Sequence, residues 1–337
     1  MKNVAVVGAT GAVGHELLAL LEARNFPVGK LLPLASSRSA GSTITFRGEA
    51  VTVEEATPEA FAGMDLVFFA ATGSLSRELA PAAARAGAVV IDKSSTWRMD
   101  PEVPLVVPEV NPEDLRKHKG IISSPNCTTI GLVMALKPLH DVAPITRVIV
   151  TTMQAVSGTG KEAIEELEQQ TRAWVEGREG ELPHTVYKRQ IAFNVLPYAE
   201  TFTENLYTTE ELKLSAETRK IMGLPDLPVT MTCTRVPVFV GHSESVLVEF
   251  ERKVTPEEAR EALSRFPGVR VVDDPFQFVF PTAIDVAGTD DTLVGRIRED
   301  LTNEKGLWLW IVSDNLRKGA ATNAVQIAEK LLEMQLI

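Results

Sequence analysis

Continuous apolar runs and helically spaced apolar faces alternate along the first 126 residues. Strands of the buried, parallel kind are predicted at 3–7, 31–34, 66–70, 88–91 and 121–122. Between the first two strands, Leu17, Leu18, Leu20 and Leu21 share one helix face. A second helix is predicted over 75–85, and a hairpin over 44–46 and 50–53. This β-α-β rhythm predicts an α/β fold with a doubly wound parallel sheet.

The pattern changes after residue 126. Segments 145–155 and 229–236 alternate between apolar and polar residues, which is typical of a sheet with one covered face. Charged helices are predicted over 161–176 and 208–222, and Thr208 and Glu211 have the spacing of a capping box. An apolar strand at 307–312 precedes a final helix at 320–336. We therefore expect a dinucleotide-binding domain from residues 1–126 and 315–337. Residues 127–314 should form an α+β domain with an antiparallel or mixed sheet.

Composition narrows the possible partners. The 337 residues suffice for two domains, and the net charge of −11 argues against nucleic acid and anionic membranes as partners. Two cysteines give no disulfide framework and favour a reducing compartment, so we expect a cytoplasmic protein. A strand begins almost at residue 1, which leaves no room for a signal peptide, and no apolar run approaches the length of a membrane span.

A glycine-rich turn stands between the first strand and the first helix. The sequence Gly8-Ala-Thr-Gly-Ala-Val-Gly14 allows the backbone to approach a pyrophosphate bound at the helix N-terminus. The alternative is a tight turn without a ligand. We expect a dinucleotide to contact Gly8, Thr10, Gly11, Ala12, Val13 and Gly14.

The turn after the second strand indicates which dinucleotide is bound. Sites specific for NAD usually have an acidic residue here, whereas this chain has Ser37, Arg38 and Ser39. Hydroxyls and a guanidinium suit the 2′-phosphate of NADP. The alternative for Arg38 is a solvated loop residue. We therefore expect NADP as the cofactor.

Cys127 follows a predicted strand end and begins an apolar run long enough for a buried helix. Unpaired N–H groups and the helix dipole at such a position favour a thiolate, which is the reactive form. Asn126 offers an amide beside the sulfur. The alternative is a small buried hydrophobe. Cys233 lies inside an alternating strand, where burial should keep it protonated.

Further candidate residues lie in polar surroundings. Arg98 follows the strand at 88–91 and could meet an anion, or pair with Asp92 or Asp100. Glu210 and Lys213 share a helix face, with a surface ion pair as the alternative. His242 is expected in a polar turn between strands, which favours function over a core role. Asn315 begins the last helix and could reach back to the first domain.

Cysteine, histidine, a nicotinamide site and basic residues in an acidic protein fit one chemistry. A thiolate attacks an activated acyl group and expels its leaving group. The thioester then accepts a hydride from the cofactor, and histidine transfers the proton. Arginines and lysine can hold a carboxylate and a phosphate.

Over essentially its whole length the chain resembles the bacterial aspartate-semialdehyde dehydrogenases. The matching motifs are Gly8-Ala-Thr-Gly-Ala-Val-Gly14, Trp97-Arg-Met-Asp100, Ser124-Pro-Asn-Cys-Thr-Thr129, Gln154 to Gly160, Glu210-Glu-Leu-Lys213, Arg235-Val-Pro237, Gly241-His-Ser243 and Ser313-Asp-Asn-Leu-Arg-Lys-Gly319. The resemblance implies a two-domain arrangement like that of glyceraldehyde-3-phosphate dehydrogenase. It implies reversible, NADP-dependent conversion of L-4-aspartyl phosphate into L-aspartate 4-semialdehyde and phosphate. This reaction belongs to the biosynthesis of lysine, threonine, methionine and diaminopimelate.

The resemblance also implies residue roles. Cys127 would be the acyl-thioester nucleophile and His242 the acid/base, with Asn126 near the acyl oxygen. Gln154, Glu210 and Arg235 would contact the substrate, Arg235 at the α-carboxylate and Glu210 at the amine. Arg98 and Lys213 would bind phosphate. The cofactor would also contact Gly73, Ser157, Gly158 and Asn315. The resemblance implies no metal, and a homodimer formed through the second domain.

Two alternatives stay open. N-acetyl-glutamyl-phosphate reductase uses the same thioester chemistry, but its acylated amine would have no charge for Glu210 to pair. A non-catalytic NADP-binding relative would have no need for Cys127 and His242 together. The stretch from Gly177 to Thr185 matches no pattern with a clear meaning.

Overall fold

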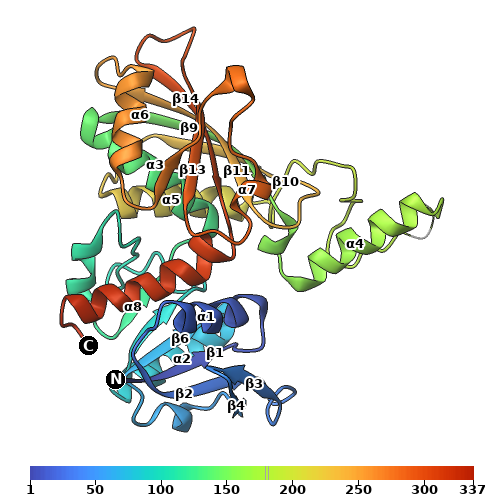
Figure 1. Cartoon of the computed structure of the whole chain (residues 1–337), viewed down its shortest axis with the longest axis vertical. Coiled ribbons are helices and arrows are strands. Elements are labelled where there is room, and N and C mark those ends of the chain that lie inside the picture. The colour runs from blue at the N-terminus through green and yellow to red at the C-terminus, as the bar shows by residue number, and fades with distance from the viewer. Residues whose placement is uncertain (179, 181) are drawn as a thin grey trace. The chain divides into compact units, whose positions relative to one another are not determined.

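The chain divides into two compact units, which are described one at a time. The computed structural model describes residues 1–178, 180 and 182–337. The first unit is Met1–Asn126 with Ala320–Ile337, and the second is Cys127–Gly319 (Figure 1). Residues 179 and 181 of the uninterpreted stretch lie outside the described residues. Within the described part, no helix has the length and apolar character needed to cross a membrane.

The first unit is built on a six-stranded parallel sheet in the order β5-β2-β1-β6-β7-β8. The strands are β1 (Lys2–Val7), β2 (Val28–Ala35), β5 (Glu54–Glu55), β6 (Leu66–Phe69), β7 (Val89–Asp92) and β8 (Ile121–Ser123). The predicted hairpin is confirmed as β3 (Thr43–Phe46) and β4 (Glu49–Thr52). Short 3₁₀ turns occur at η1 (Pro58–Phe61) and η2 (Pro112–Lys117). The parallel strand order confirms the doubly wound sheet expected from the sequence.

Helices cover both faces of this sheet, because β1 is apolar on both sides. Val4 and Val6 pack in one buried cluster with leucines of α1 (Ala12–Ala23) and with α8 (Asn323–Glu333). Ala5 and Val7 pack in a second cluster with α2 (Gly73–Arg85). Continuous apolar strands are therefore the expected signature of this unit.

The second unit contains a six-stranded mixed sheet in the order β10-β9-β11-β14-β13-β12. The strands are β9 (Ile145–Gln154), β10 (Val229–Arg235), β11 (His242–Phe250), β12 (Val269–Val271), β13 (Thr292–Glu299) and β14 (Gly306–Ser313). The central pairs are antiparallel, whereas β9 with β10 and β12 with β13 are parallel. Alternation of apolar and polar residues along a strand indicates which face of the sheet is covered. It does not indicate whether the neighbouring strand is parallel or antiparallel.

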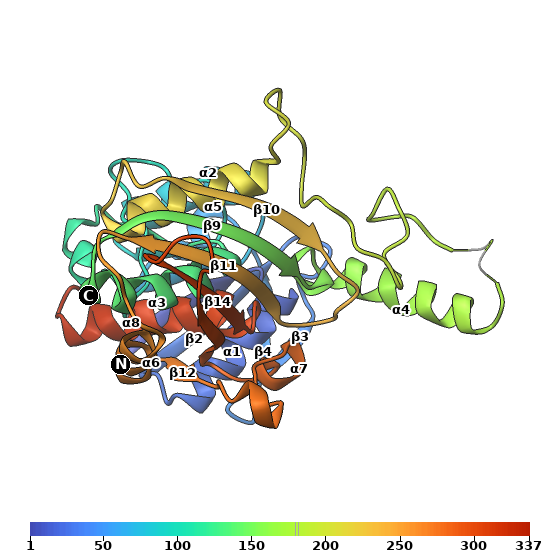
Figure 2. The same ribbon diagram turned by 90° about the horizontal axis from the view of Figure 1, so that it is seen from above.

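Three helices lie against one face of this mixed sheet (Figure 1), namely α3 (Cys127–Val142), α5 (Thr209–Met222) and α6 (Pro256–Arg265). Figures 1 and 2 show α4 (Lys161–Val175) extending away from the sheet. Smaller elements are η3 (Val156–Gly158), η5 (Pro275–Gln277) and α7 (Ala283–Val286). The helix predicted at 320–336 is divided into a π-helical turn, η6 (Arg317–Thr322), and α8.

Candidate active site

Cys127 is the first residue of α3, as the sequence predicted. Its Sγ lies 3.3 Å from His242 Nε2, and the side chain is only partly buried. The sulfur therefore lies at the N-terminus of α3, where the helix dipole favours negative charge, and beside the imidazole of His242. The contact places a partly exposed thiol beside a histidine, as thioester chemistry requires.

His242 departs from the expectation of a polar turn. It is the first residue of β11 and is fully buried, because β11 alternates and directs His242 and Glu244 to the face covered by α3. Burial lowers the pKa of His242 well below its usual value, and Arg235 lowers it further. The ring is therefore neutral at neutral pH.

The hydrogen bonds of His242 fix its tautomer. Its Nδ1 accepts the N–H of Ala155 at 3.0 Å, so the single proton of the neutral ring is on Nε2. That N–H faces the sulfur of Cys127. A neutral imidazole in this orientation donates to a thiolate, and is an acid rather than a base in the resting protein.

Two glycines allow the backbone to come close to this pair. A Cβ on Gly319 would lie 2.9 Å from the Cβ of Cys127. A Cβ on Gly158 would lie 3.0 Å from Arg235 Nη1 and 3.1 Å from His242 Nε2. All three distances are shorter than ordinary van der Waals contacts, so a larger residue at either glycine would displace the reacting groups.

Arg235 ends β10 and is buried beside the pair. Its Nη1 donates to the carbonyl of Ala155 at 2.8 Å. The peptide groups of Ala155 thus hold both the imidazole and the guanidinium. Since Gly158 faces both groups, an anionic ligand beside Gly158 would meet the guanidinium and the ring together.

Gln154 links three elements under the site. Its Nε2 donates to Thr128 Oγ1 at 3.1 Å and to Glu210 Oε1 at 3.0 Å, and all three side chains are buried. These bonds join the end of β9 to the first turns of α3 and α5. Glu210 is therefore not part of a surface ion pair with Lys213.

Lys213 pairs with a different carboxylate. Its Nζ lies 2.6 and 2.7 Å from the two oxygens of Glu200. Burial raises the pKa of Glu200, but the bonds from Lys213 and Thr209 outweigh this effect and hold the pKa below its usual value. The capping box of Thr208 and Glu211 at the start of α5 is confirmed.

Asn315 is hydrogen-bonded to two segments of the second unit. Its Oδ1 accepts the N–H of Gly241 at 2.9 Å, and its Nδ2 donates to Ser157 Oγ at 2.8 Å. These partners belong to the second unit, where Asn315 connects η3 to the turn before His242. Asn315 therefore lies in the second unit, whereas the sequence had suggested the start of the returning first-domain segment.

In the first unit the glycine-rich turn has the expected close packing. Gly8 has a φ of +84°, and a Cβ there would lie 2.3 Å from the carbonyl oxygen of Ala70. A Cβ on Gly14 would lie 2.1 Å from the oxygen of Gly8. Between them Gly11 and Ala12 are exposed at the start of α1, and Thr10 and Val13 are partly buried. The turn therefore presents backbone N–H groups that can donate hydrogen bonds to a pyrophosphate.

The other expected residues of the first unit fall into two groups. Ser37 and Arg38 are exposed after β2, with Ser39 partly buried, and Gly73 begins α2. Asn126 and Arg98 are buried, and Arg98 donates to the carbonyl of Lys93 at 2.7 Å. Burial raises the pKa of Asp92, while bonds from Ser94 and the charge of Arg98 act in the opposite direction. The suggested interaction of Arg98 with Asp92 is thus present as an electrostatic one.

Several residues of the site carried no signal in the sequence. Glu217 accepts from Thr129 Oγ1 at 3.1 Å in the buried contact between α3 and α5. Glu244 is fully buried, and burial raises its pKa well above the usual value. Gly319 lies against Cys127 only because η6 brings it there. Burial also raises the pKa of Cys233, as expected. Among the described residues, no group of His, Cys, Asp and Glu is arranged to hold a metal ion.

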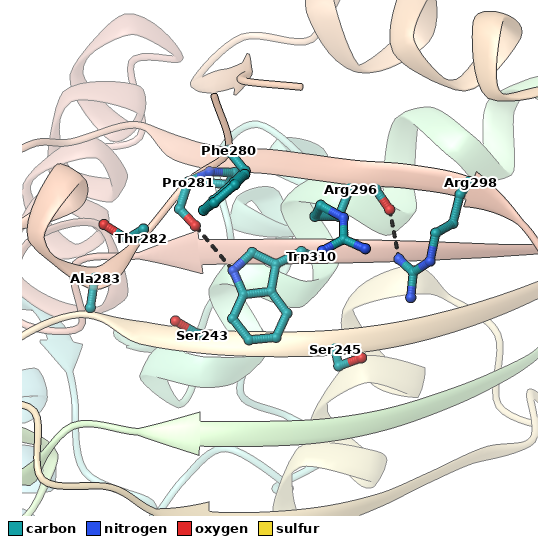
Figure 3. Close-up of a pocket in the computed structure, with 9 residues that line it drawn as sticks. All are labelled: Ser243, Ser245, Phe280, Pro281, Thr282, Ala283, Arg296, Arg298 and Trp310. Atoms are coloured by element: carbon teal, nitrogen blue, oxygen red, sulfur yellow. Dashed lines mark hydrogen bonds between the residues drawn. The ribbon is translucent and has the colours of Figure 1, made fainter. Parts of the chain in front are cut away.

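A cavity of about 400 Å³ lies on the other face of the mixed sheet. Figure 3 shows Trp310, whose Nε1 donates to the carbonyl of Pro281 at 3.1 Å, beside Arg296 and Arg298. Ser243 and Ser245 line this cavity, whereas His242 and Glu244 point to the face that carries α3. The cavity is therefore separate from Cys127 and His242.

A partly exposed cysteine beside a buried histidine in a mixed-sheet unit, together with a parallel sheet and a glycine-rich turn, fits a semialdehyde dehydrogenase. Residues 3–118 match the semialdehyde dehydrogenase NAD-binding domain, and residues 136–318 match the semialdehyde dehydrogenase dimerisation domain. The chain belongs to the aspartate-semialdehyde dehydrogenases, oxidoreductases of aspartate-family amino-acid biosynthesis.

Known relatives match the whole chain. The aspartate-semialdehyde dehydrogenase of Aquifex aeolicus is 55% identical over 99% of both chains, and that of Bacillus subtilis is 50% identical over the same shares. The crystal structure of aspartate semialdehyde dehydrogenase II from Vibrio cholerae has a TM-score of 0.96 and 45% identity, covering 99% of both chains. These relatives decide between the readings left open by the sequence in favour of the aspartate enzyme.

Proposed function

We propose that the chain catalyses the NADP-dependent reductive dephosphorylation of L-4-aspartyl phosphate to L-aspartate 4-semialdehyde, reversibly and through a thioester on Cys127. The observation that carries this proposal is the 3.3 Å contact between Cys127 Sγ and His242 Nε2 at the N-terminus of α3. A related structure from Vibrio cholerae is described as a complex with ASA, which supports the same substrate.

The first step forms the thioester. The helix N-terminus and the Nε2–H of His242 stabilise the Cys127 thiolate, which attacks the acyl carbon of aspartyl phosphate. A C–S bond forms, the C–O bond to the phosphoryl group breaks, and phosphate leaves with the electron pair. Once the sulfur is acylated, the Nε2–H can donate to negative charge on the acyl oxygen.

The second step returns the thiolate. When bound, NADPH would supply the hydride for reduction of the thioester carbon. The C–S bond then breaks, the aldehyde is released, and the sulfur leaves as a thiolate that His242 again stabilises. In the opposite direction the Cys127 thiolate adds to the semialdehyde carbonyl, and the Nε2–H of His242 donates a hydrogen bond to the resulting oxyanion. Loss of hydride to the cofactor would leave the thioester, and phosphate would then attack the acyl carbon and expel the thiolate.

The substrate-binding proposal follows the charges of the site. Arg235 is assigned to the α-carboxylate, Glu210 to the amine, and Lys213 with Arg98 to phosphate. Buried Gln154 orients Glu210 and the first turn of α3. Asn126 is assigned to the acyl oxygen. Arg235 and Glu210 are both buried, so an opposite charge on the substrate would interact strongly with each of them.

NADP is the proposed cofactor. The glycine-rich turn fits a pyrophosphate, because Gly8 and Gly14 leave no room for a side chain. Exposed Ser37 and Arg38, with Ser39 beside them, are proposed to bind the 2′-phosphate. Gly73, Ser157, Gly158 and Asn315 complete the proposed contacts. A structure from Candida albicans, 27% identical with a TM-score of 0.77, is described as an aspartate semialdehyde dehydrogenase with NADP.

A homodimer is the proposed assembly. Residues 136–318 match a dimerisation domain, and α3, α5 and α6 lie on one face of its sheet. On the other face, Trp310, Arg296 and Arg298 border the cavity of Figure 3. A second copy is proposed to pack on this face of the sheet.

The direct test maps the thioester. Protein mixed with aspartyl phosphate in the absence of NADPH should gain an acyl adduct on the peptide that contains Cys127. Cys127→Ala should lose the adduct and turnover while still binding NADPH. Cys233→Ser is the matched control and should keep both, since Cys233 is fully buried. An adduct on Cys233, or full activity of Cys127→Ala, would contradict the proposal.

A further inference from the structure

Two polar side chains on the projecting helix α4 are buried, one turn apart. Glu166 and Gln170 both face the returning segment 183–192 (Figure 2 shows α4 and this segment). Gln170 donates to the carbonyl of Pro183 at 2.6 Å and accepts the N–H groups of Ile191 and Ala192, each at 3.0 Å. The proposed reaction uses neither residue.

Glu166 binds the backbone of three successive residues. Its Oε2 accepts the N–H groups of Thr185 at 2.7 Å and Val186 at 2.6 Å, and also the hydroxyl of Thr185 at 2.8 Å. Its Oε1 accepts the N–H of Tyr187 at 3.2 Å. A carboxylate that is 2% exposed is thus compensated by backbone donors, which fixes the backbone of 185–187.

Tyr187 extends from this fixed segment toward the site. Its ring is buried against Val156 and Leu167, and its hydroxyl donates to Thr159 Oγ1 at 2.9 Å. Burial raises the pKa of Tyr187, while the charge of Arg235 acts in the opposite direction. The phenol therefore lies within the electrostatic reach of the guanidinium proposed to bind the substrate carboxylate.

Thr159 directly follows Gly158, which faces Arg235 and His242. The backbone of segment 157–159 is bonded within its own 3₁₀ turn and, through the N–H of Ser157, to the carbonyl of Phe239. Its side chains add two further attachments. Ser157 is bonded to Asn315, and Thr159 is bonded to Tyr187. Both Gly158 and Thr159 are exposed, so packing alone does not hold this end of the segment.

We infer that Tyr187 is a positioning residue for substrate binding, and that Glu166 holds Tyr187 in place for this purpose. Tyr187 fixes Thr159, and Thr159 fixes Gly158 against Arg235. The inference rests on the proposed function, because it takes Arg235 as the group that binds the α-carboxylate. The projecting helix thereby contributes to the affinity of the site without touching the substrate.

Tyr187→Phe tests the inference because it removes only the hydroxyl. One hydrogen bond corresponds to roughly a three- to tenfold effect, so the KM for aspartate semialdehyde should rise by about that factor. The kcat and the dissociation constant of NADP⁺ should stay within about twofold, because Ser157 keeps its bond to Asn315. Tyr207→Phe is the matched control. It also removes a tyrosine–threonine bond, from Tyr207 to Thr230 at 3.2 Å, and should leave the KM unchanged.

Two further variants separate positioning from general stability. Thr159→Val should raise the same KM, and combining it with Tyr187→Phe should add nothing, since both remove one bond. Glu166→Gln should lower the melting temperature and raise the same KM. Additive effects in the double variant, or a Glu166→Gln protein that is less stable with the parent KM, would overturn the inference.

Arg235→Lys distinguishes failure of the inference from failure of the proposed function. Lysine cannot reproduce a bidentate grip on a carboxylate, so this variant should raise the KM for aspartate semialdehyde strongly. If Arg235→Lys raises this KM and Tyr187→Phe does not, the inference alone is wrong. If Arg235→Lys leaves it unchanged, Arg235 does not bind the carboxylate, and the inference falls with that assignment.

Discussion

Gly158→Ala introduces a single methyl group close to Arg235 and His242, the residues proposed to bind the substrate carboxylate and to stabilise the thiolate. The new carbon would lie 3.0 Å from Arg235 Nη1 and 3.1 Å from both Cε1 and Nε2 of His242. All three distances are shorter than ordinary van der Waals contacts, so one of the two groups must move by a few tenths of an ångström. His242 is held by Ala155 on one side and contacts Cys127 on the other, which leaves it little freedom. A misplacement of about 1 Å costs up to roughly 100-fold, so a shift of a few tenths of an ångström should lower kcat/KM by about 3- to 10-fold.

Two assays identify the cause of this loss. Turnover is followed by NADPH absorbance, and the rate at which iodoacetamide alkylates Cys127 is measured without cofactor or substrate. Both rates should fall. The unfolded-state gain of about 0.4–1 kcal/mol from replacing glycine by alanine at an ordinary φ opposes the cost of the close contacts, so the melting temperature should change little. Gly180→Ala is the matched control, since a Cβ at Gly180 meets nothing within 4 Å. Parent values of both rates in Gly158→Ala would refute the reasoning.

Two more substitutions test the cofactor and the buried acid. Arg38→Ala should weaken NADPH binding by roughly 1.5–3 kcal/mol, the value of a charged hydrogen bond, and leave NADH binding unchanged in a fluorescence titration. Equal affinities of the parent for the two cofactors would contradict this assignment. Burial raises the folded-state pKa of Glu244 above its usual value, so the folded protein binds this proton more tightly than the unfolded chain. The free energy of unfolding of the parent should therefore fall as pH rises above about 4.5, because folding then costs Glu244 its negative charge. In urea unfolding, the stability of Glu244→Gln relative to the parent should increase steadily between pH 5 and 8. A difference between the two proteins that does not change with pH would show that Glu244 titrates alike in both states.

Local sequence patterns were sufficient for the elements that depend on local physics. The apolar run after Cys127 predicted the start of α3, because a buried helix needs an unbroken apolar surface. The spacing of Thr208 and Glu211 predicted the capping box of α5. The continuous strands of the first unit predicted its parallel sheet. In each of these cases the determining contacts lie within a few residues or on one element.

The interpretations that failed depended on contacts between distant segments. His242 was placed in a turn because its neighbours are polar, yet α3 covers this end of β11 and buries it. The bonds of Asn315 to Ser157 and Gly241 span 158 and 74 residues, and no pattern around Asn315 indicates them. No local pattern indicates the role of Glu166 either, because the sequence around it is typical of a charged, solvent-exposed helix. Its role follows only from the return of segment 183–192 to α4.

The return of residues 320–337 to the first unit sets an order for folding during synthesis. Ala324, Ile327 and Ala328 of α8 share a buried cluster with Val4 and Val6, near the opposite end of the chain. The ribosome therefore releases every residue of Cys127–Gly319 before the parallel sheet can obtain its full cover. Until then one side of that sheet exposes apolar strands to solvent, and this is the period in which nascent chains need protection from aggregation.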